Sequence, residues 1–185
     1  MIALIDCGSS KTPAIAAALE EYVDVQVIGL FDFKAELLDN FRGIVISGAP
    51  ILLTELDPEP YLKHFSWVKT YPNPLLGICF GHQILGLLHG ARISRMREDR
   101  AFQEIEVLQD DLLFERLPDI FEMQEDHCEH ISLPNGFELI ACSDACINEA
   151  MKHKQMPHYG VQFHPEVSGN YGHVLLANFA NIVQG

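Results

Sequence analysis

The chain has 185 residues, of which 48% are hydrophobic, and a formal net charge of −14. This length suits one domain with a full hydrophobic core, and the composition excludes an intrinsically disordered chain. The strong negative charge argues against a nucleic-acid partner, because phosphate binding relies on clusters of Lys and Arg.

The N-terminus and the cysteines indicate the compartment. Residues 1–6 lack the basic segment of a secretory signal, and Asp6 stands where such a signal is apolar. No apolar run reaches the roughly 18 residues of a membrane-spanning helix. The five cysteines are odd in number and scattered, which does not fit a disulfide framework. We therefore expect a soluble, cytoplasmic protein with reduced thiols and no membrane partner.

The first half of the chain alternates short apolar runs with helical patterns. Strands are predicted at residues 2–5, 23–30, 43–48 and 75–78. Helices are predicted at 13–22, 34–40, 58–71 and in the segment that ends at 88. Thr12 is expected to cap the first helix, with Pro13 at its first position. Strands that alternate with helices are typical of a parallel sheet with crossover helices.

The pattern changes after residue 90. The only basic patch consists of four arginines between positions 92 and 100, diluted by Glu98 and Asp99. We interpret it as a solvated surface rather than as a contact for an acidic partner or ligand. Strand candidates follow at 103–108, 121–124, 137–142, 147–152 and 158–163, before a final helix at 171–183. We expect an α/β fold: an open, mostly parallel sheet flanked by helices, with an additional β-rich antiparallel section in the second half. No repeat, low-complexity tract or linker divides the chain, so residues 1–185 are predicted to form a single domain.

Three short segments follow predicted strands and are candidates for one site. They are the turn at 47–50, the residue Cys79, and the segment from His164 to Glu166. In an open α/β sheet, ligands bind outside the carboxyl ends of the strands. The three segments are therefore expected to meet, although they lie far apart in the sequence.

Cys79 stands between a predicted strand and a predicted helix, in the sequence GICFG at 77–81. This is the pattern of a nucleophile elbow, in which a sharp turn needs small residues on both sides of the nucleophile. At a helix N-terminus the dipole and the free N–H groups favour a thiolate. On the local sequence alone, a buried structural cysteine explains the pattern equally well.

A thiolate nucleophile needs a base and a group that orients the base. His164 and Glu166 supply both, and their spacing at a strand end lets the two side chains leave the same face. The N–H groups of Gly48 and Phe80 are candidates for an oxyanion hole. For Gly48, a tight structural turn is the alternative that the local sequence favours.

Almost the whole chain resembles a class I glutamine amidotransferase domain, on the segments ISGAP (46–50), GICFGHQ (77–83) and GVQFHPE (160–166). Within that family it is most similar to the separate glutaminase subunits of two-subunit GMP synthases. The resemblance implies a flavodoxin-like fold and a cysteine-dependent hydrolysis of the side-chain amide of L-glutamine.

The resemblance also implies roles for individual residues. Cys79 would form a γ-glutamyl thioester, His164 would protonate the departing ammonia and activate water, and Glu166 would orient His164. Gly48 and Phe80 would bind the oxyanion through their N–H groups, and Gln83 would help to hold the substrate.

The ammonia would pass to a partner synthetase, an ATP-pyrophosphatase subunit that adenylates xanthosine monophosphate. The chain has no phosphate-binding glycine-rich loop and no ATP-pyrophosphatase motif. We therefore expect no cofactor in this chain, and ATP and Mg²⁺ on the partner.

Two segments depart from the family pattern. Ala49 replaces the second glycine of a Gly-Gly-Pro turn. A Trp-x-Ser-His-x-Asp pattern aligns with 124–129, where only His127 is retained. In the family this segment helps to bind the α-amino and α-carboxyl groups of glutamine. Asp126, in the position of the serine, would add a negative charge near that carboxylate or pair with the ammonium.

Alternative functions remain for these residues. The sequence HCEH at 127–130 contains metal-binding residue types, but on a strand His127 and Glu129 share one face while Cys128 and His130 share the other. We therefore predict no metal site. Besides an ammonia-delivering glutaminase, the chain is compatible with a stand-alone hydrolase of γ-glutamyl amides or peptides, and with a regulatory module that has lost turnover.

Overall fold

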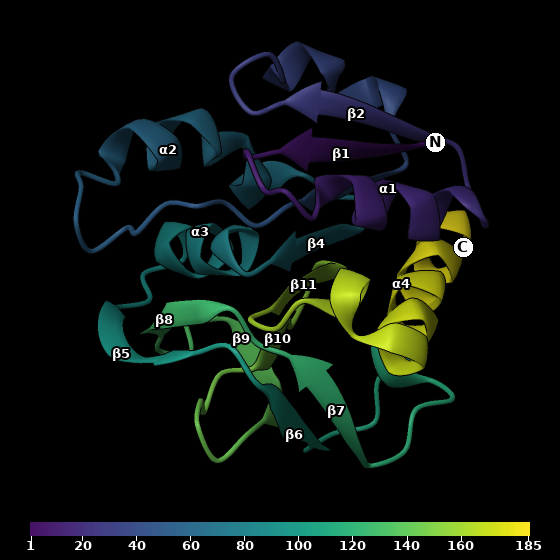
Figure 1. Ribbon diagram of the computed structural model, residues 1–185. Coiled ribbons are helices and arrows are strands. Elements are labelled where there is room, and N and C mark those ends of the chain that lie inside the picture. The colour runs from purple at the N-terminus through teal and green to yellow at the C-terminus, as the bar shows by residue number, and fades with distance from the viewer.

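The computed structural model describes residues 1–185 and is built around one large sheet (Figure 1). Its nine strands lie in the order β2-β1-β3-β4-β11-β10-β9-β6-β7. The strands are β1 (Ile2–Asp6), β2 (Val25–Gly29), β3 (Gly43–Ile46), β4 (Leu75–Ile78), β6 (Phe102–Val107), β7 (Ile120–Gln124), β9 (Phe137–Cys142), β10 (Ala150–His153) and β11 (His158–Val161). A separate antiparallel ribbon pairs β5 (Ile93–Asp99) with β8 (His127–Ile131).

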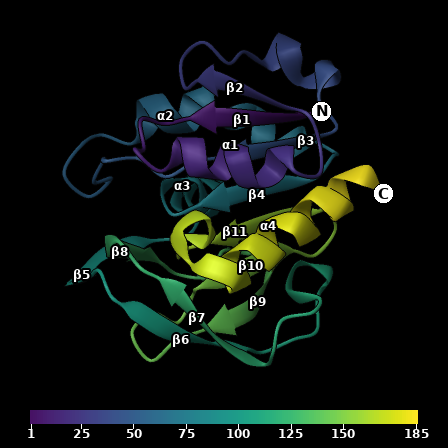
Figure 2. The same ribbon diagram turned by 45° about the vertical axis from the view of Figure 1, so that its right-hand side comes forward.

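The parallel half of the sheet has helices on both faces. The helices are α1 (Thr12–Glu20), α2 (Glu59–His64), α3 (Phe80–Leu88) and α4 (Gly169–Gln184). Figure 2 shows α1 and α4 over the same face of the sheet, where they contact each other. Alternate residues of β1 serve the two faces: Ile2 and Leu4 pack in the cluster with α1 and α4, and Ala3 and Ile5 pack in the cluster with α3.

The predicted antiparallel section is present and continues the same sheet. The strands β11 and β4 are parallel partners, whereas β10 pairs antiparallel with both β11 and β9. β6 then joins β9 to β7, again antiparallel. A single sheet thus runs through both halves of the chain and places the carboxyl ends of β3, β4 and β11 side by side.

Several sequence-based boundaries were wrong. Lys11, not Thr12, occupies the cap of α1, because the Thr12 hydroxyl donates a hydrogen bond to Asp6 Oδ1 (2.8 Å). The helix predicted at 58–71 is divided into α2 and a 3₁₀ turn at Ser66–Thr70, and the one at 34–40 is a 3₁₀ turn. β5 was missed, because its residues are half-buried or exposed and lack an apolar alternation.

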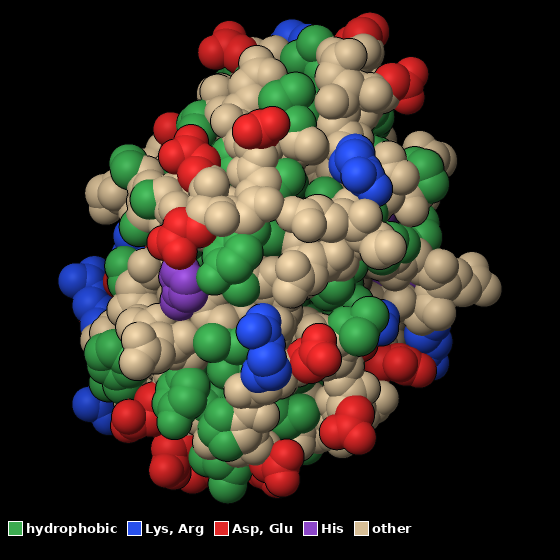
Figure 3. Space-filling model, turned by 90° about the vertical axis from the view of Figure 1, so that its right-hand side faces the viewer, with side chains coloured by type: hydrophobic (Ala, Val, Ile, Leu, Met, Phe, Trp, Pro, Cys, Tyr) green, Lys and Arg blue, Asp and Glu red, His purple; other side chains and the backbone are tan.

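The surface agrees with the acidic composition. Acidic side chains are spread from top to bottom over the face seen in Figure 3. None of the helices combines the length and the apolar character that crossing a bilayer would require.

Candidate active site

Cys79 occupies a strained turn between β4 and α3. Its backbone has φ 50° and ψ −102°, a region that residues with a side chain rarely adopt. The two flanking glycines make the turn possible. A Cβ at Gly77 would lie 2.5 Å from the backbone of Gly81, and a Cβ at Gly81 would lie 2.4 Å from the carbonyl oxygen of Ile46. The geometry is that of the predicted nucleophile elbow, with Cys79 at the N-terminus of a helix.

His164 and Glu166 form a buried pair. The Nδ1 atom of His164 lies 2.7 Å from Glu166 Oε1, and both side chains are almost fully buried. The prediction that strand spacing aligns them was wrong, because β11 ends at Val161. His164 instead precedes a 3₁₀ turn at Pro165–Val167, and this turn carries the Glu166 carboxylate back toward the imidazole ring.

The backbone holds His164 in place from both sides. Its N–H donates to the carbonyl oxygen of Gln124 at the end of β7 (2.9 Å). Its own carbonyl oxygen accepts a hydrogen bond from Ser168 Oγ (2.6 Å), and that hydroxyl accepts one from the Gln124 N–H (2.9 Å). His164 is therefore fixed between the parallel and antiparallel parts of the sheet.

His164 is positively charged near neutral pH, as expected for a histidine that pairs with a thiolate. Burial lowers the pKa of its imidazole, but hydrogen bonds and charges from Cys79 and Glu166 outweigh burial and raise the pKa to about 10. Near neutral pH the ring is thus an imidazolium beside the Cys79 sulfur. It can give a proton to a leaving amine and take one back from water.

The turn after β3, which contains Gly48, lies against both Cys79 and His164. A Cβ at Gly48 would lie 3.1 Å from Cε1 of His164 and 3.7 Å from Cβ of Cys79. The Gly48 N–H makes no hydrogen bond within the chain. The Phe80 N–H lies in the first turn of α3, where N–H groups lack helical partners. Both groups are thus suitably placed donors for an oxyanion.

A cavity of about 550 Å³ opens over these residues. Its volume lies in the range of small-ligand sites. The predicted site residues that line it are Ala49, Cys79, Phe80, Gln83, Asp126, His127 and His164. The structure therefore brings the sequence-predicted residues to one site.

Gln83 anchors two segments of the cavity wall. Its side-chain amide donates to the Glu129 carbonyl oxygen (3.3 Å) and to Gln162 Oε1 (3.2 Å). The amide of Gln162 in turn lies 3.6 Å from Cys79 Sγ. Gln162 was not predicted as a site residue, because only its neighbours in the GVQFHPE segment suggested chemistry. Contact of Gln83 with a substrate stays a prediction.

Asp126 is flanked by two cations that sequence reasoning missed. Its carboxylate lies 2.5 Å from Lys11 Nζ and 3.4 Å from Arg100 Nε. Burial raises the pKa of Asp126, but Lys11 outweighs burial, so that the pKa lies below its usual value. The negative charge expected here is therefore largely offset. Arg100, interpreted from the sequence as solvated surface, also lines the cavity.

Glu129 closes the cavity from the side of β8. Its carboxylate accepts hydrogen bonds from the N–H groups of Leu53 (3.0 Å) and Thr54 (2.8 Å) and from the Thr54 hydroxyl (2.5 Å). Glu129 thus fixes the loop that follows β3. As predicted, His127 and Glu129 share the buried face of β8, away from Cys128 and His130.

Comparisons with known proteins identify the family. Residues 3–183 match the model of the family described as glutamine amidotransferase class-I. The chain belongs to the class I glutamine amidotransferases. It is 35% identical to the glutamine-hydrolyzing subunit of the GMP synthase of Pyrococcus abyssi, over 98% of both chains. It is 38% identical to the protein of the same name from Methanocaldococcus jannaschii, over 98% of this chain and 97% of the relative.

Solved structures confirm the fold of this amidotransferase. A protein of Thermoplasma acidophilum described as a GMP synthase subunit superposes with a TM-score of 0.90 at 30% identity, covering 99% of this chain and 93% of the other. A glutamine amidotransferase of Thermotoga maritima shares the fold with a TM-score of 0.75 at 21% identity, over 92% and 77% of the two chains. The predicted α/β fold with its antiparallel section is confirmed, and the chain is a glutamine amidotransferase enzyme.

Proposed function

We propose that this amidotransferase is the glutamine-hydrolysing subunit of a two-subunit GMP synthase. It would convert L-glutamine to glutamate and ammonia, and the ammonia would aminate xanthosine monophosphate on a partner. The observation that carries the proposal is the strained Cys79 beside the buried pair of His164 and Glu166. The glutamine-hydrolyzing GMP synthase subunits that match over nearly the full chain support the product.

The site suggests how each bond changes. The Cys79 thiolate adds to the side-chain carbonyl carbon of glutamine, and the N–H groups of Gly48 and Phe80 stabilise the oxyanion. His164 transfers its proton to the amide nitrogen, the carbon–nitrogen bond breaks, and ammonia leaves a γ-glutamyl thioester. His164 then takes a proton from water, whose oxygen attacks the thioester carbon. Collapse of this second intermediate releases glutamate and Cys79, while Glu166 orients His164 throughout.

A partner has to supply the second half of the reaction. An ATP-pyrophosphatase synthetase would bind ATP and Mg²⁺ and activate xanthosine monophosphate, so that this chain needs no cofactor. The cytoplasm is the compartment that we propose, in keeping with five free thiols. The proposed site residues and the mechanism lie wholly within this chain, and the acceptor chemistry wholly on the partner.

A reconstitution experiment tests the proposed function. Purified chain is mixed with a candidate synthetase, ATP, Mg²⁺, xanthosine monophosphate and L-glutamine, and GMP is measured. We expect slow glutamine hydrolysis by the chain alone, at least roughly tenfold faster hydrolysis with the partner, and GMP formation from glutamine.

Ammonium chloride in place of glutamine is the control, because it bypasses this chain and should support GMP synthesis by the partner alone. Efficient cleavage of γ-glutamyl peptides with glutamine ignored would contradict the proposal and favour a stand-alone hydrolase.

The charges around Asp126 predict a specific effect on substrate binding. In the variant Lys11→Met, Asp126 loses its nearest cation, and the cavity then repels the α-carboxylate of glutamine. We expect KM for glutamine to rise by about tenfold with kcat nearly unchanged, equivalent to about 1.4 kcal/mol of binding. Steady-state glutaminase kinetics measure both constants.

The double variant Lys11→Met with Asp126→Asn is the matched control, because it removes the cation and the anion together. Its KM should return most of the way to that of the wild type. A KM as high as that of Lys11→Met alone would show that Lys11 acts through something other than its charge balance with Asp126.

A further inference from the structure

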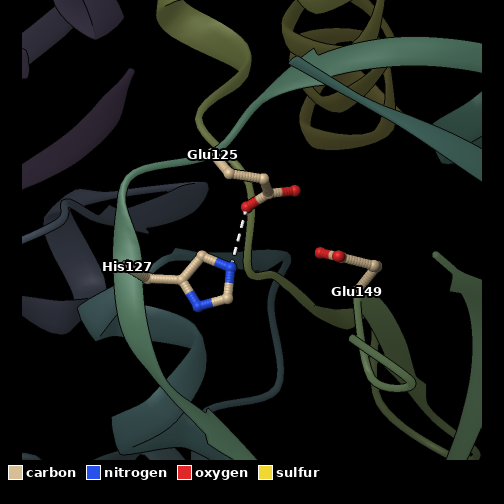
Figure 4. A group of neighbouring side chains, drawn as sticks. All are labelled: Glu125, His127 and Glu149. Carbon is tan, nitrogen blue, oxygen red and sulfur yellow. Dashed lines mark ion pairs between the residues drawn. The ribbon is translucent and has the colours of Figure 1, made fainter. Parts of the chain in front are cut away.

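A second carboxylate–histidine cluster lies buried behind the active-site cavity. It consists of Glu125, in the turn between β7 and β8, His127, at the start of β8, and Glu149, just before β10. Both glutamates are 0% exposed and His127 is 7% exposed. Figure 4 shows the carboxyl groups of Glu125 and Glu149 pointing toward each other beside the imidazole ring. None of the steps proposed above uses this cluster.

The contacts of His127 define its charge. Its Nδ1 atom lies 2.8 Å from the carbonyl oxygen of Glu129, and its Nε2 atom lies 3.0 Å from Glu125 Oε2. The Glu129 carbonyl oxygen can only accept a hydrogen bond, so Nδ1 carries a proton. The contact between Nε2 and Glu125 has the distance of an ion pair without the alignment of a hydrogen bond, and a second proton on Nε2 gives the ring the positive charge of that pair. Burial lowers the pKa of His127, but Glu125 outweighs burial and raises the pKa to about 9.

The two carboxyl groups need a proton between them. Glu149 Oε1 accepts a hydrogen bond from Ser143 Oγ (2.6 Å), but Glu149 Oε2 and both carboxylate oxygens of Glu125 have no hydrogen-bond donor. Two buried carboxylates beside one imidazolium would leave one negative charge uncompensated. Burial, followed by the charge of Glu125, raises the pKa of Glu149 to about 8. A proton on Glu149 lets this carboxyl donate to Glu125 and balances the charge of the cluster.

His127 connects this cluster to the nucleophile. Its ring lines the same cavity as Cys79, and the thiolate charge of Cys79 is one of the influences that raise the pKa of His127. A positive charge on His127 attracts a negative charge on the Cys79 sulfur across this cavity. Glu149 is also tied to the site through its carbonyl oxygen, which accepts a hydrogen bond from the N–H of Gln162 (2.8 Å).

We propose that Glu125 holds His127 as an imidazolium against the active site, with a neutral Glu149 donating to Glu125, and that this pair stabilises the Cys79 thiolate. Cys79 would thus lie between two carboxylate–histidine pairs, of which the second acts at a distance. Glu125 and Glu149 are positioning residues. The proposal deepens the proposed function and rests on its assignment of Cys79 as the nucleophile.

Other titratable groups near the cluster do not supply this charge. They are His82 from α3, Cys146 from the loop before β10, and Asp99, which pairs with His127 across the ribbon of β5 and β8. The Asp99 carboxylate accepts hydrogen bonds from the Ala101 N–H (3.0 Å) and the Gln103 side-chain amide (2.8 Å). Burial lowers the pKa of His82 to about 3, so this ring is neutral near pH 7. Burial raises the pKa of Cys146, which keeps it a thiol. Glu125 therefore remains the anion in direct contact with His127.

The test measures the thiolate of Cys79 directly, by the pH dependence of its alkylation with iodoacetamide. The rate measured on Cys79→Ala is subtracted as the background from the other cysteines. For Glu125→Gln we expect an alkylation rate about tenfold lower at pH 7, with the half-maximal rate displaced by about one pH unit upward. Glu149→Gln imitates the neutral acid and should lower the rate less than threefold. Glu122→Gln, an exposed position on β7, should match the wild type.

Nitrogen-15 NMR of histidine provides a second readout, in which the protonation of His127 is measured on the unmutated protein. Both ring nitrogens of His127, assigned through His127→Gln, should be protonated at pH 7. A neutral His127, an unchanged alkylation profile in Glu125→Gln, or equal losses in Glu125→Gln and Glu149→Gln would each overturn the proposal. So would one equivalent of a divalent metal in the purified protein, measured by mass spectrometry and lost in both variants.

The outcomes separate this proposal from the proposed function. If the chain does not support GMP synthesis but shows the expected alkylation profile and a protonated His127, only the proposed synthetase partner and the proposed product, GMP, are rejected. Normal GMP synthesis with a neutral His127 would reject the second pair alone.

Discussion

Replacing Cys79 with Ala is expected to reduce glutamine hydrolysis by roughly 10⁴-fold or more, to the background of the assay. Without the sulfur, no thioester forms, and the imidazolium of His164 has no nucleophile to serve. The cavity and its charged groups remain, so the variant should still bind glutamine. Glutamate release, measured by a coupled assay, and glutamine binding, measured by calorimetry, give the two quantities separately.

Cys7 offers a matched control in the same sheet. It lies just after β1 and is only 5% exposed, and burial raises the pKa of its thiol to about 12. It therefore remains a thiol, and its sulfur lies against the carbonyl oxygen of Ile5 (3.8 Å). Cys7→Ala should keep kcat within about twofold of the wild type. Unchanged turnover in Cys79→Ala, or a loss in Cys7→Ala as large as in Cys79→Ala, would reject the assignment of the nucleophile.

The meeting of Cys79, His164 and Glu166 could be predicted from the sequence because each segment has a local signature. A cysteine between two glycines at a strand-to-helix junction marks the elbow, since Gly77 and Gly81 leave room for no side chain. The segment of His164 and Glu166 was found for its residue types, although the prediction gave the wrong reason for their alignment. A 3₁₀ turn, not strand alternation, brings the two side chains together.

The missed residues depend on contacts between distant segments. Lys11 pairs with Asp126 across 115 positions of the sequence. Glu125 and Glu149 meet only because the antiparallel section places the turn before β8 against the segment before β10. Each of these residues, taken alone, resembles an ordinary surface charge. Only the tertiary structure shows that two of them are fully buried and that the others face the cavity.

The ribbon of β5 and β8 shows a further limit of sequence patterns. β5 is held by its pairing with β8 and has no fully buried residue, so its sequence carries no hydrophobic periodicity. By contrast, β1, β3 and β4 are buried on both faces and appear in the sequence as continuous apolar runs. The buried strands of the parallel half could therefore be predicted from the sequence, whereas the poorly buried strand β5 could not.

Replacing His164 with Asn is the second substitution with a large expected effect. The variant keeps a polar side chain of similar size but removes the group that protonates ammonia and activates water. We expect kcat to fall by roughly 10³-fold, with a smaller change in KM. Added imidazole should restore little activity, because His164 is only 3% exposed. A kcat within tenfold of the wild type would contradict the role of His164.

The effect of His164→Asn on the free energy of unfolding is expected to change with pH. His164 has a pKa of about 10 in the folded chain, against about 6.5 in an unfolded one. A raised pKa means that the native state holds the proton more tightly, so the stabilisation is fully present below pH 6.5 and is lost as the pH rises through 10. The excess free energy of unfolding of the wild type over His164→Asn should therefore shrink steadily between pH 6.5 and 10. Urea titrations at pH 6, 8 and 10 measure this difference, and a constant difference would show that His164 is not held as an imidazolium by Glu166 and Cys79.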